Sequence, residues 1–428
     1  MTNGANSIQV MIVTRLMTGF EGCLHSGHWR PSGSPAMAKL IEELAGSADI
    51  RVNLVFTRSL LAGRPDQWLK PFHGRSVELQ GLATSPLVLC CFITQLSGHR
   101  FSTTHFLCRE IAHLWRVLTR LRRVRPDVVY FDRSNWFIAA FIARFTSTKV
   151  VFRLLGVPPD LNHIFSSWRP FNILLRWAFR SPFNHVVCSM DGSGGGQWME
   201  AALLKNVPRS LLLNGVEPNA LARLRYAKPD PQTGPLKLVF LGRIEAIKGI
   251  GLFIEALFDW PPEQRKRICP LIVGSGLELD SLRTKVKQRS LEEWIVFAGE
   301  VPSDEIPSLL ADQDFYLSLN TQGHLSNSTL EAMAAGLGII VRSVAGEGDA
   351  NREFDRVLPR DAQIQLDADI SASQLTDELL RLSDDSERRR RMRRLAWESV
   401  GQSLAGWDLR TKNEMHIIRG VARPHEVT

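Results

Sequence analysis

Strand-length runs of apolar residues alternate with helical segments along most of the chain, and this alternation limits the possible folds more than any other feature. The runs in the first half are IQVMIVTRL, IRVNLVFTRS, PDVVYFD, KVVFRLLG and NHVVCSM. Helical periodicity separates them, for example in GSPAMAKLIEELAG, which closes at Gly46. Because continuous apolar runs suit strands that are buried on both faces, the pattern predicts a doubly wound α/β domain with a parallel sheet.

The same alternation starts again in the second half of the chain. Residues 221–236 are rich in Pro and polar residues and predict a linker. After them come LKLVFLGR, CPLIVGSG, WIVFAGEV, DFYLSLN and GIIVRSV, with helical segments between. We therefore expect an N-terminal Rossmann-like domain over residues 1–220, a C-terminal one over 237–403, and a last helical segment over 404–428.

Charge is unequally divided between the two halves. Residues 1–220 hold 24 Lys and Arg against 13 Asp and Glu, whereas residues 221–428 hold 28 against 31. A basic half suits nucleic acid, an anionic membrane surface or an acidic substrate. The run RRRRMRR at 388–394 follows the acidic SDDSE and predicts a solvated helix face. No aromatic stacking platform or nucleic-acid module accompanies these charges, so nucleic acid is not an expected partner.

Cysteine spacing and hydropathy indicate the compartment. The six Cys include no C-x2-C pair, which argues against a zinc site or a redox pair and favours a reducing compartment. The first residues lack a basic segment followed by a clean apolar run, and no stretch reaches the ~18–20 apolar residues of a membrane span. We therefore expect a cytoplasmic protein.

The most informative motif is LKLVFLGRIEAIKGIGLFIEAL. A buried strand ends at Gly242, Arg243 follows, and Lys248 stands at the entrance to an amphipathic helix. Open α/β sheets bind ligands at the carboxyl ends of their strands, so two cations there suit a diphosphate. The alternative is an ordinary pair of solvated basic residues in a loop.

A second motif, SLNTQGHLSNSTLEAMAAG, predicts a helix whose start faces the same edge. Its SNST run, with Asn327, is a helix N-cap signal. The amides of Ser328, Thr329 and Leu330 are expected to point toward an anion. Glu331 lies one turn inside and suits the hydroxyl pair of a ribose; alternatively it only favours the helix dipole.

GRIEAIKG, followed by SNSTLEAMAAG, resembles the donor-binding domain of GT-B glycosyltransferases, specifically the retaining family 4 type (glycosyl transferases group 1). LNGVEP, LIVGSG with Gly274, FAGEV and AGWDL with Trp407 add to the resemblance. It implies two Rossmann-like domains facing a cleft, with the C-terminal helix crossing back to the first. It also implies a UDP- or GDP-linked sugar donor, retention of configuration, and no metal or cofactor. Arg243 and Lys248 then hold the diphosphate, with Gly242 beside them, and Glu331 binds the ribose as the second Glu of a Glu-x7-Glu motif.

The first Glu of that motif is missing. Gly323 stands in its place, between Gln322 and His324, so the carboxylate that usually lies by the donor sugar is absent. Either Gln322 or His324 contacts the sugar instead, or activity is lost. Two alternatives to a transferase therefore stay open: a catalytically degenerate nucleotide-sugar-binding protein and a nucleotide-sugar epimerase.

In the first domain the resemblance implies an acceptor site. Asp132 ends the strand PDVVYFD, where the family commonly has a polar residue near the sugar and acceptor. It orients an acceptor hydroxyl or caps the helix that begins near Asn135. Ser32, Gly33 and Ser34 correspond to the family's glycine-rich loop after the first strand, although Pro35 alone explains a turn there.

Aromatic and basic residues are interleaved at 165–183, FSSWRPFNILLRWAFRSPF, and a second basic cluster lies at 114–125. Such a helix suits the interface of an anionic membrane, and an aromatic helix packed in the core is the alternative. The membrane interpretation predicts peripheral binding to the inner face of the membrane and a lipid-linked or cell-surface glycan as acceptor.

Overall fold

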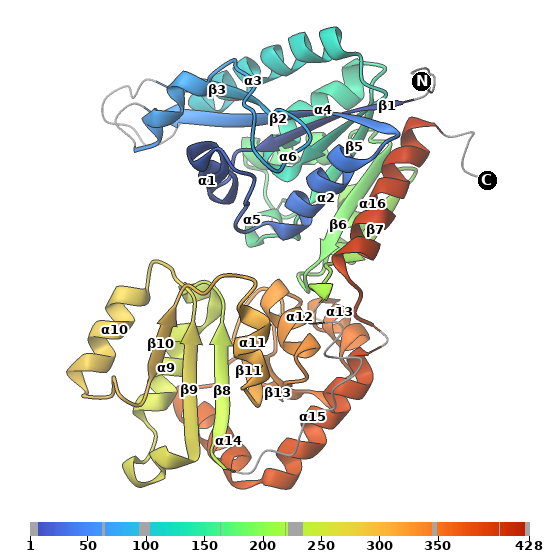
Figure 1. Cartoon of the computed structure of the whole chain (residues 1–428). Helices are drawn as coiled ribbons and strands as arrows, with labels where there is room; N and C mark the ends of the chain where they lie inside the picture. Colours follow the sequence, from blue (N-terminus) through green and yellow to red (C-terminus); the bar gives the residue numbers. More distant parts are fainter. Residues whose placement is uncertain are drawn as a thin grey trace. The chain divides into compact units, whose positions relative to one another are not determined.

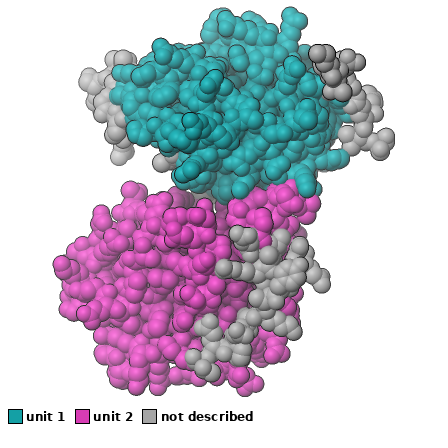
Figure 2. Space-filling model, viewed as in Figure 1, with its two compact units in different colours: residues 1–189, 196–212, 410–428 teal, residues 190–195, 213–409 magenta. Residues whose placement is uncertain are grey.

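The structure, a computed structural model, describes residues 7–61, 65–93, 103–162, 164–218, 220, 234–344, 349–401 and 403–423. These residues form two compact units, coloured separately in Figure 2. Unit 1 comprises residues 1–189, 196–212 and 410–428, and unit 2 comprises residues 190–195 and 213–409. Most of the expected linker, residues 221–233, lies outside the described residues.

A seven-stranded sheet in the order β3-β2-β1-β4-β5-β6-β7 forms the centre of unit 1 (Figure 1). β1 pairs in parallel with β2 on one side and β4 on the other, with Val10 opposite both Val52 and Val128. The strand bounds are β1 Ile8–Arg15, β2 Ile50–Leu61, β3 Leu87–Ile93, β4 Val128–Asp132, β5 Lys149–Leu154, β6 His185–Met190 and β7 Arg209–Leu213.

Helices cover both faces of this sheet because successive strand residues point to opposite sides. Met11 and Val13 lie in one core, with α3, α4, α6 and α7; Val10 and Ile12 lie in the other, with α1, α2 and α16. The helix bounds are α1 Thr18–Ser26, α2 Pro35–Gly46, α3 Thr103–Val124, α4 Trp136–Phe145, α5 Pro159–Asn162, α6 Pro170–Phe179, α7 Gly195–Ala202 and α16 Trp407–Ala422. Two 3-10 turns, η1 Pro65–Phe72 and η2 Arg133–Asn135, complete the unit.

A buried ionic network fixes α16 on the sheet of unit 1. The carboxylate of Glu414 accepts hydrogen bonds from the Tyr130 hydroxyl and from Arg410, and Arg153 lies 3.5 Å from it. Glu414, Arg153 and Tyr130 are all at most 1% exposed. Burial opposes the charge of Glu414, yet Arg153 and Arg410 hold its pKa below the usual range. Each charge is therefore paired where water cannot reach it.

We expect Glu414→Ala to destabilise unit 1 by about 3–5 kcal/mol, because it leaves two guanidinium groups buried without their anion. Urea unfolding would measure the loss, and faster amide hydrogen exchange in α16 would locate it. The control is Arg419→Ala on the same helix, whose partly exposed pair with Asp49 is expected to contribute less than about 1 kcal/mol. Equal losses in both variants would contradict a dominant role for the buried network.

Unit 2 is built around a six-stranded sheet in the order β10-β9-β8-β11-β12-β13, and the neighbouring strands run parallel. β8 lies between β9 and β11, so the strand order reverses there. The strand bounds are β8 Leu236–Leu241, β9 Ile268–Val273, β10 Val296–Gly299, β11 Phe315–Ser318, β12 Gly338–Arg342 and β13 Ile364–Leu366. This point of reversal is where open α/β sheets bind ligands.

Two cores lie on the two faces of this sheet. α9, α10 and α14 contribute to one, and α11, α12, α13 and much of α15 contribute to the other. The helix bounds are α9 Ile250–Phe258, α10 Leu279–Gln288, α11 Ile306–Ala311, α12 Asn327–Ala334, α13 Asp349–Val357, α14 Ala372–Asp384 and α15 Ser386–Val400. The 3-10 turns are η3 Ala246–Lys248, η4 Pro262–Arg267 and η5 Arg360–Ala362.

The prediction of two Rossmann-like domains is thus confirmed, whereas the prediction for the basic run in α15 is wrong in part. Arg389 and Arg393 are buried rather than solvated. Arg389 donates to the carbonyl of Gly234 at 3.1 Å, and Arg393 pairs with buried Asp314 at 3.2 Å. Arg388 pairs with Glu378 on α14 at 2.7 Å. The run therefore joins α15 to other elements of unit 2.

Candidate functional site

Three loops meet at the carboxyl edge of the second sheet, after β8, β9 and β11. The amide of Gly242 donates to Val273 at 3.0 Å, and the amide of Ile244 donates to Ser275 at 2.8 Å. On the other side the amide of Thr321 donates to Ile247 at 3.1 Å. The residues after β8 are therefore held between the two neighbouring loops.

Glycine is required where these loops touch. A Cβ at Gly274 would lie 1.9 Å from the carbonyl oxygen of Gly242. A Cβ at Gly249 would lie 2.5 Å from the carbonyl oxygen of Leu319, and its φ of +72° also disfavours a side chain. Gly274, predicted to be donor-binding, thus has a role in backbone packing, whereas a Cβ at Gly242 would meet nothing within 4 Å. Donor contact of either glycine stays a prediction.

The two predicted cations lie on this edge in different environments. The Arg243 side chain is 69% exposed and pairs with Glu245 at 2.8 Å. Lys248 is half-buried at the end of η3, and burial, together with the charge of Arg243, lowers the pKa of its amine. Within the described ranges the amine has no hydrogen-bond or ion-pair partner, although Asp191 and Glu245 act on it electrostatically. A half-buried cation without a hydrogen-bond partner suits an anionic ligand.

The amides at the start of α12 were predicted to point toward an anion from Ser328, Thr329 and Leu330, and the structure changes this set. Ser326 is the N-cap, and its hydroxyl accepts from the Thr329 amide at 3.3 Å. The Leu330 amide donates to the Ser326 carbonyl at 3.0 Å. The prediction that these two amides face an anion is therefore wrong, because the cap already uses them. The amides of Asn327 and Ser328 precede the first intrahelical bond.

Glu331 lies on the first turns of α12 beside a second carboxylate. Burial, together with the nearby charge of Glu217, raises the pKa of Glu331 to about 7. In the described part of the chain its side chain has no hydrogen-bond partner. Glu217 follows Asn214, whose side-chain amide donates to the Asn327 side chain at 2.9 Å, so the LNGVEP segment adjoins the start of α12. Glu217 belongs to the LNGVEP segment of the resemblance, but it was not predicted to lie beside Glu331.

We expect Glu331→Gln to change how stability depends on pH. A carboxyl group whose folded pKa is raised from 4.5 to about 7 contributes stability below pH 4.5 and loses it as the pH rises through 7. The variant should therefore be more stable than the wild type at pH 8, by on the order of 1–3 kcal/mol.

Urea unfolding of both proteins at pH 5.5 and pH 8 would measure this difference. Glu217→Gln is the matched control, because removing the neighbouring charge should reproduce part of the gain while keeping Glu331. A wild-type stability that rises toward pH 8 relative to Glu331→Gln would contradict the raised pKa.

His324, one of the two residues predicted to replace the missing carboxylate, is buried, and its contact with a sugar stays a prediction. Its ring is 1% exposed, lies 3.1 Å from the Ser318 hydroxyl through Nδ1, and makes an edge contact with Phe354. Burial lowers the pKa of His324 to about 4, so the ring is neutral near pH 7. His324 thus packs under its own loop through Ser318 and Phe354. Gln322 is half-buried, and its backbone amide donates to the side-chain oxygen of Asn320 at 3.3 Å. Its contact with a sugar stays a prediction.

A segment that the sequence did not single out, residues 190–195 after β6, also belongs to unit 2. The amide of Leu325 donates to the Asp191 carbonyl at 3.0 Å. Burial raises the pKa of the Asp191 carboxyl, and the positive charge of Lys248 opposes this increase. The run DGSGGG at the end of a strand was the available signal, since such glycines often permit close backbone approach.

In unit 1, the structure gives Asp132 a structural position. Its carboxylate accepts from the Thr14 hydroxyl at 2.7 Å, the Arg15 amide at 3.0 Å and the Asn135 side chain at 2.8 Å. Asp132 is fully buried and makes no side-chain cap to η2. The predicted helix cap is therefore wrong, because the carboxylate instead joins β1 to the end of β4. Contact of Asp132 with an acceptor hydroxyl stays a prediction.

The loop Ser32-Gly33-Ser34 does precede a helix, α2, as expected. Gly33 and Ser34 both have positive φ, +72° and +44°. The Ser32 amide donates to the Gly19 carbonyl at 3.2 Å, which ties the loop to α1, a helix that the sequence analysis did not predict. Contact of this loop with a donor or acceptor stays a prediction.

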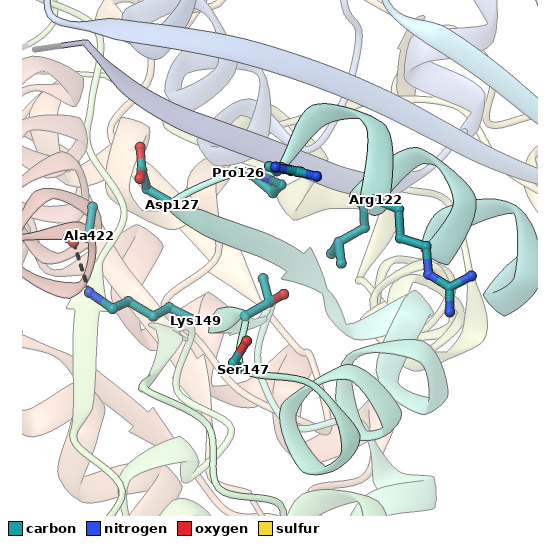
Figure 3. Close-up of a pocket in the computed structure, with 9 residues that line it drawn as sticks. Arg122, Pro126, Asp127, Ser147, Lys149 and Ala422 are labelled. Atoms are coloured by element: carbon teal, nitrogen blue, oxygen red, sulfur yellow. Dashed lines mark hydrogen bonds between the residues drawn. The ribbon is translucent and has the colours of Figure 1, made fainter. Parts of the chain in front are cut away.

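A separate hollow of about 620 Å³ lies in unit 1, at the amino-terminal ends of β4 and β5 (Figure 3). Asp127, before β4, and Lys149, at the start of β5, line it, and the Lys149 amine donates to the Ala422 carbonyl at 2.8 Å. Arg122 and Arg125 add positive charge. Because ligands of open α/β sheets bind at carboxyl ends, this hollow is not the candidate site.

Comparison with known proteins shows which proteins unit 2 and the whole fold resemble. Residues 226–398 match the sequence model of the family described as glycosyl transferases group 1. An uncharacterized glycosyltransferase of Methanocaldococcus jannaschii is 31% identical over 112 residues, 26% of this chain and 28% of that protein. A GDP-mannose-dependent alpha-(1-6)-phosphatidylinositol monomannoside mannosyltransferase of Mycobacterium tuberculosis is 27% identical over 190 residues, 40% of this chain and 48% of that protein. The chain thus spans less than half the length of either relative.

The solved structure of HepE from Anabaena in complex with UDP is similar across both units. It has a TM-score of 0.60 and 15% sequence identity, and the similarity covers 96% of this chain and 100% of that chain. At this identity the likeness concerns the fold. Residues 226–398 of unit 2 are therefore similar to the glycosyl transferases group 1 family, and the chain as a whole has the GT-B fold.

Proposed function

We propose that the chain is a glycosyltransferase that moves a sugar from a UDP- or GDP-linked donor to an acceptor hydroxyl. The observation that carries this proposal is Lys248, a half-buried amine without a hydrogen-bond partner among the described residues, next to Arg243 at the carboxyl end of β8. The group 1 domain match at 226–398 and the UDP-bound protein of the same fold support it.

The chemistry follows from where negative charge develops. In the transfer, the acceptor oxygen bonds to the anomeric carbon, the bond from that carbon to the diphosphate breaks, and the acceptor's proton passes to the leaving diphosphate. Arg243, Lys248 and the first amides of α12 would stabilise the charge on the leaving diphosphate. These groups supply the positive charge that a divalent ion would otherwise provide, so we propose a metal-independent reaction. Retention of configuration belongs to the same proposal and rests on the family resemblance.

Glu331 would accept hydrogen bonds from the ribose hydroxyls. Its carboxyl group has no hydrogen-bond partner in the ranges that the structure describes, and it lies on the helix that carries the free amides. A diol supplies two donors, which match the two oxygens of a carboxylate. Donor binding would then also hold Glu331 in its ionised form.

Nucleotide binding tests this proposal. We expect thermal stability to rise with UDP or with GDP, but not with ADP, by about 2.7 kcal/mol at 100 times the dissociation constant. Arg243→Ala and Lys248→Ala should each weaken the same nucleotide roughly 10- to 100-fold, because each removes a charge-assisted contact.

Arg381→Ala is the matched control, an exposed arginine on α14 whose loss should leave binding unchanged. No stabilisation by any of the three nucleotides would contradict the proposal. Binding without sugar transfer would favour a degenerate protein, and an isomeric sugar formed without acceptor would favour an epimerase.

We further propose that the acceptor is lipid-linked and that unit 1 binds an anionic membrane. Trp168 is 83% exposed and Trp115 is 69% exposed, and Phe145 is also exposed. The helices that carry or flank these residues pack on one another, since rings from α3, α4 and α6 cluster through Phe106, Trp136 and Phe171. The segment from α3 to α6 is rich in Arg and poor in acidic residues. None of the described helices is long and apolar enough to span a bilayer.

Vesicle binding tests the membrane proposal. We expect cosedimentation with phosphatidylglycerol vesicles, little with phosphatidylcholine vesicles, and weakening by salt, because anionic lipid attracts the basic layer. Replacing Trp115 and Trp168 together with Ala should reduce binding at least about 10-fold, since both rings are expected to enter the interface. Leu277→Ala, at a 94% exposed residue of unit 2, is the control. Equal binding by the double variant would contradict this face as the contact.

A further inference from the structure

The position of the missing carboxylate is occupied by backbone from another segment. A Cβ at Gly323 would lie 2.6 Å from the carbonyl carbon and oxygen of Gly192 and 2.8 Å from the carbonyl oxygen of Asp191. A Cβ at Gly192 would lie 2.8 Å from the His324 amide nitrogen, and Gly192 has a φ of +80°. No side chain fits at either glycine unless a loop moves, so a carboxylate cannot be restored at residue 323.

The segment that fills this position brings its own carboxylate, on Asp191. Its backbone is anchored twice: the Asp191 carbonyl accepts from Leu325, and the Gly194 amide donates to buried Glu353 at 3.3 Å. The side chain is oriented as well, because Oδ1 accepts from the Ser193 amide at 3.1 Å and from the Ser193 hydroxyl. Asp191 is therefore held in one place before any ligand binds.

The other oxygen, Oδ2, is available. It has no hydrogen-bond partner in the part of the chain that the structure describes. The charge of Lys248 acts to lower the pKa of Asp191, and the charge of Asp191 acts to raise the pKa of Lys248. A nucleotide-sugar donor has two parts that require different binding groups. Its diphosphate is an anion that suits Lys248, while the sugar offers hydroxyl groups that suit a carboxylate acceptor.

We propose that Asp191 binds the hydroxyl groups of the donor sugar, and so provides from the loop after β6 the carboxylate that Gly323 cannot carry. This inference rests on the proposed function, since it requires a nucleotide sugar at Lys248. It places sugar recognition and diphosphate recognition on two different segments of unit 2. The competing explanation is structural: Asp191 only holds its loop and balances the charge of Lys248.

The test compares the nucleotide alone with the nucleotide sugar. Titration calorimetry on the full chain would measure UDP, UDP-glucose, UDP-N-acetylglucosamine, GDP and GDP-mannose with the wild type, Asp191→Asn and Asp191→Ala. Asp191→Asn keeps an acceptor for Ser193, so the loop should stay in place. Asp377→Asn, an exposed residue of α14, is the control, and thermal unfolding would confirm that each variant is folded.

We expect the wild type to bind one nucleotide sugar more tightly than its parent nucleotide, and Asp191→Asn to lose that preference by 10-fold or more. Binding of the parent nucleotide should be unchanged or tighter, because Lys248 loses its anionic neighbour; a merely structural role would weaken both equally. Ser193→Ala, which frees the carboxylate, should show a smaller loss of the same kind.

Two results would overturn the inference while leaving the proposed function intact. One is equal loss of nucleotide and nucleotide sugar in Asp191→Asn, and the other is a wild type that gains nothing from any of the sugars. A wild type that binds no nucleotide at all would instead contradict the proposed function itself.

Discussion

Backbone contacts without side chains hold the candidate site together. Gly274 meets Gly242, Gly249 meets Leu319, and Gly323 meets Gly192, each at a distance that excludes a Cβ. Such contacts let loops from β8, β9 and β11 and the segment after β6 approach more closely than side chains would permit. Everything else at the site depends on them, because Lys248, Asp191 and the start of α12 have their positions only through these loops.

Charge is treated differently in the two units. In unit 1 the buried carboxylate of Glu414 has Arg153, Arg410 and Tyr130 around it, and the network fixes α16. At the edge of the second sheet Lys248 has no hydrogen-bond partner among the described residues, and Glu331 lies beside a like charge. Unmatched groups reduce the stability of a fold, so their concentration at one sheet edge indicates a binding site rather than a structural core.

A substitution within a binding site need not remove its chemistry. Gly323 lacks the carboxylate that the family resemblance predicts, yet Asp191 lies against the same loop with an oxygen to spare. If it contacts the sugar, the glycine is a consequence of the other segment's approach and not a sign of a degenerate enzyme. Whether the chain is a transferase or a degenerate binding protein thus depends on Asp191, which is distant in sequence from the Glu-x7-Glu motif.

The sequence by itself determined most of the strand and helix pattern, the two Rossmann-like domains, and Arg243 and Lys248 at a strand end, because apolar periodicity and local spacing encode these. Contacts between distant segments were decided only by the tertiary structure. Asp191 and Glu217 joined the site, His324 and Asp132 became buried supports, and two arginines of the basic run were enclosed. A residue's type and neighbours set what it can bind, but its burial and its partners depend on chain segments far away in sequence.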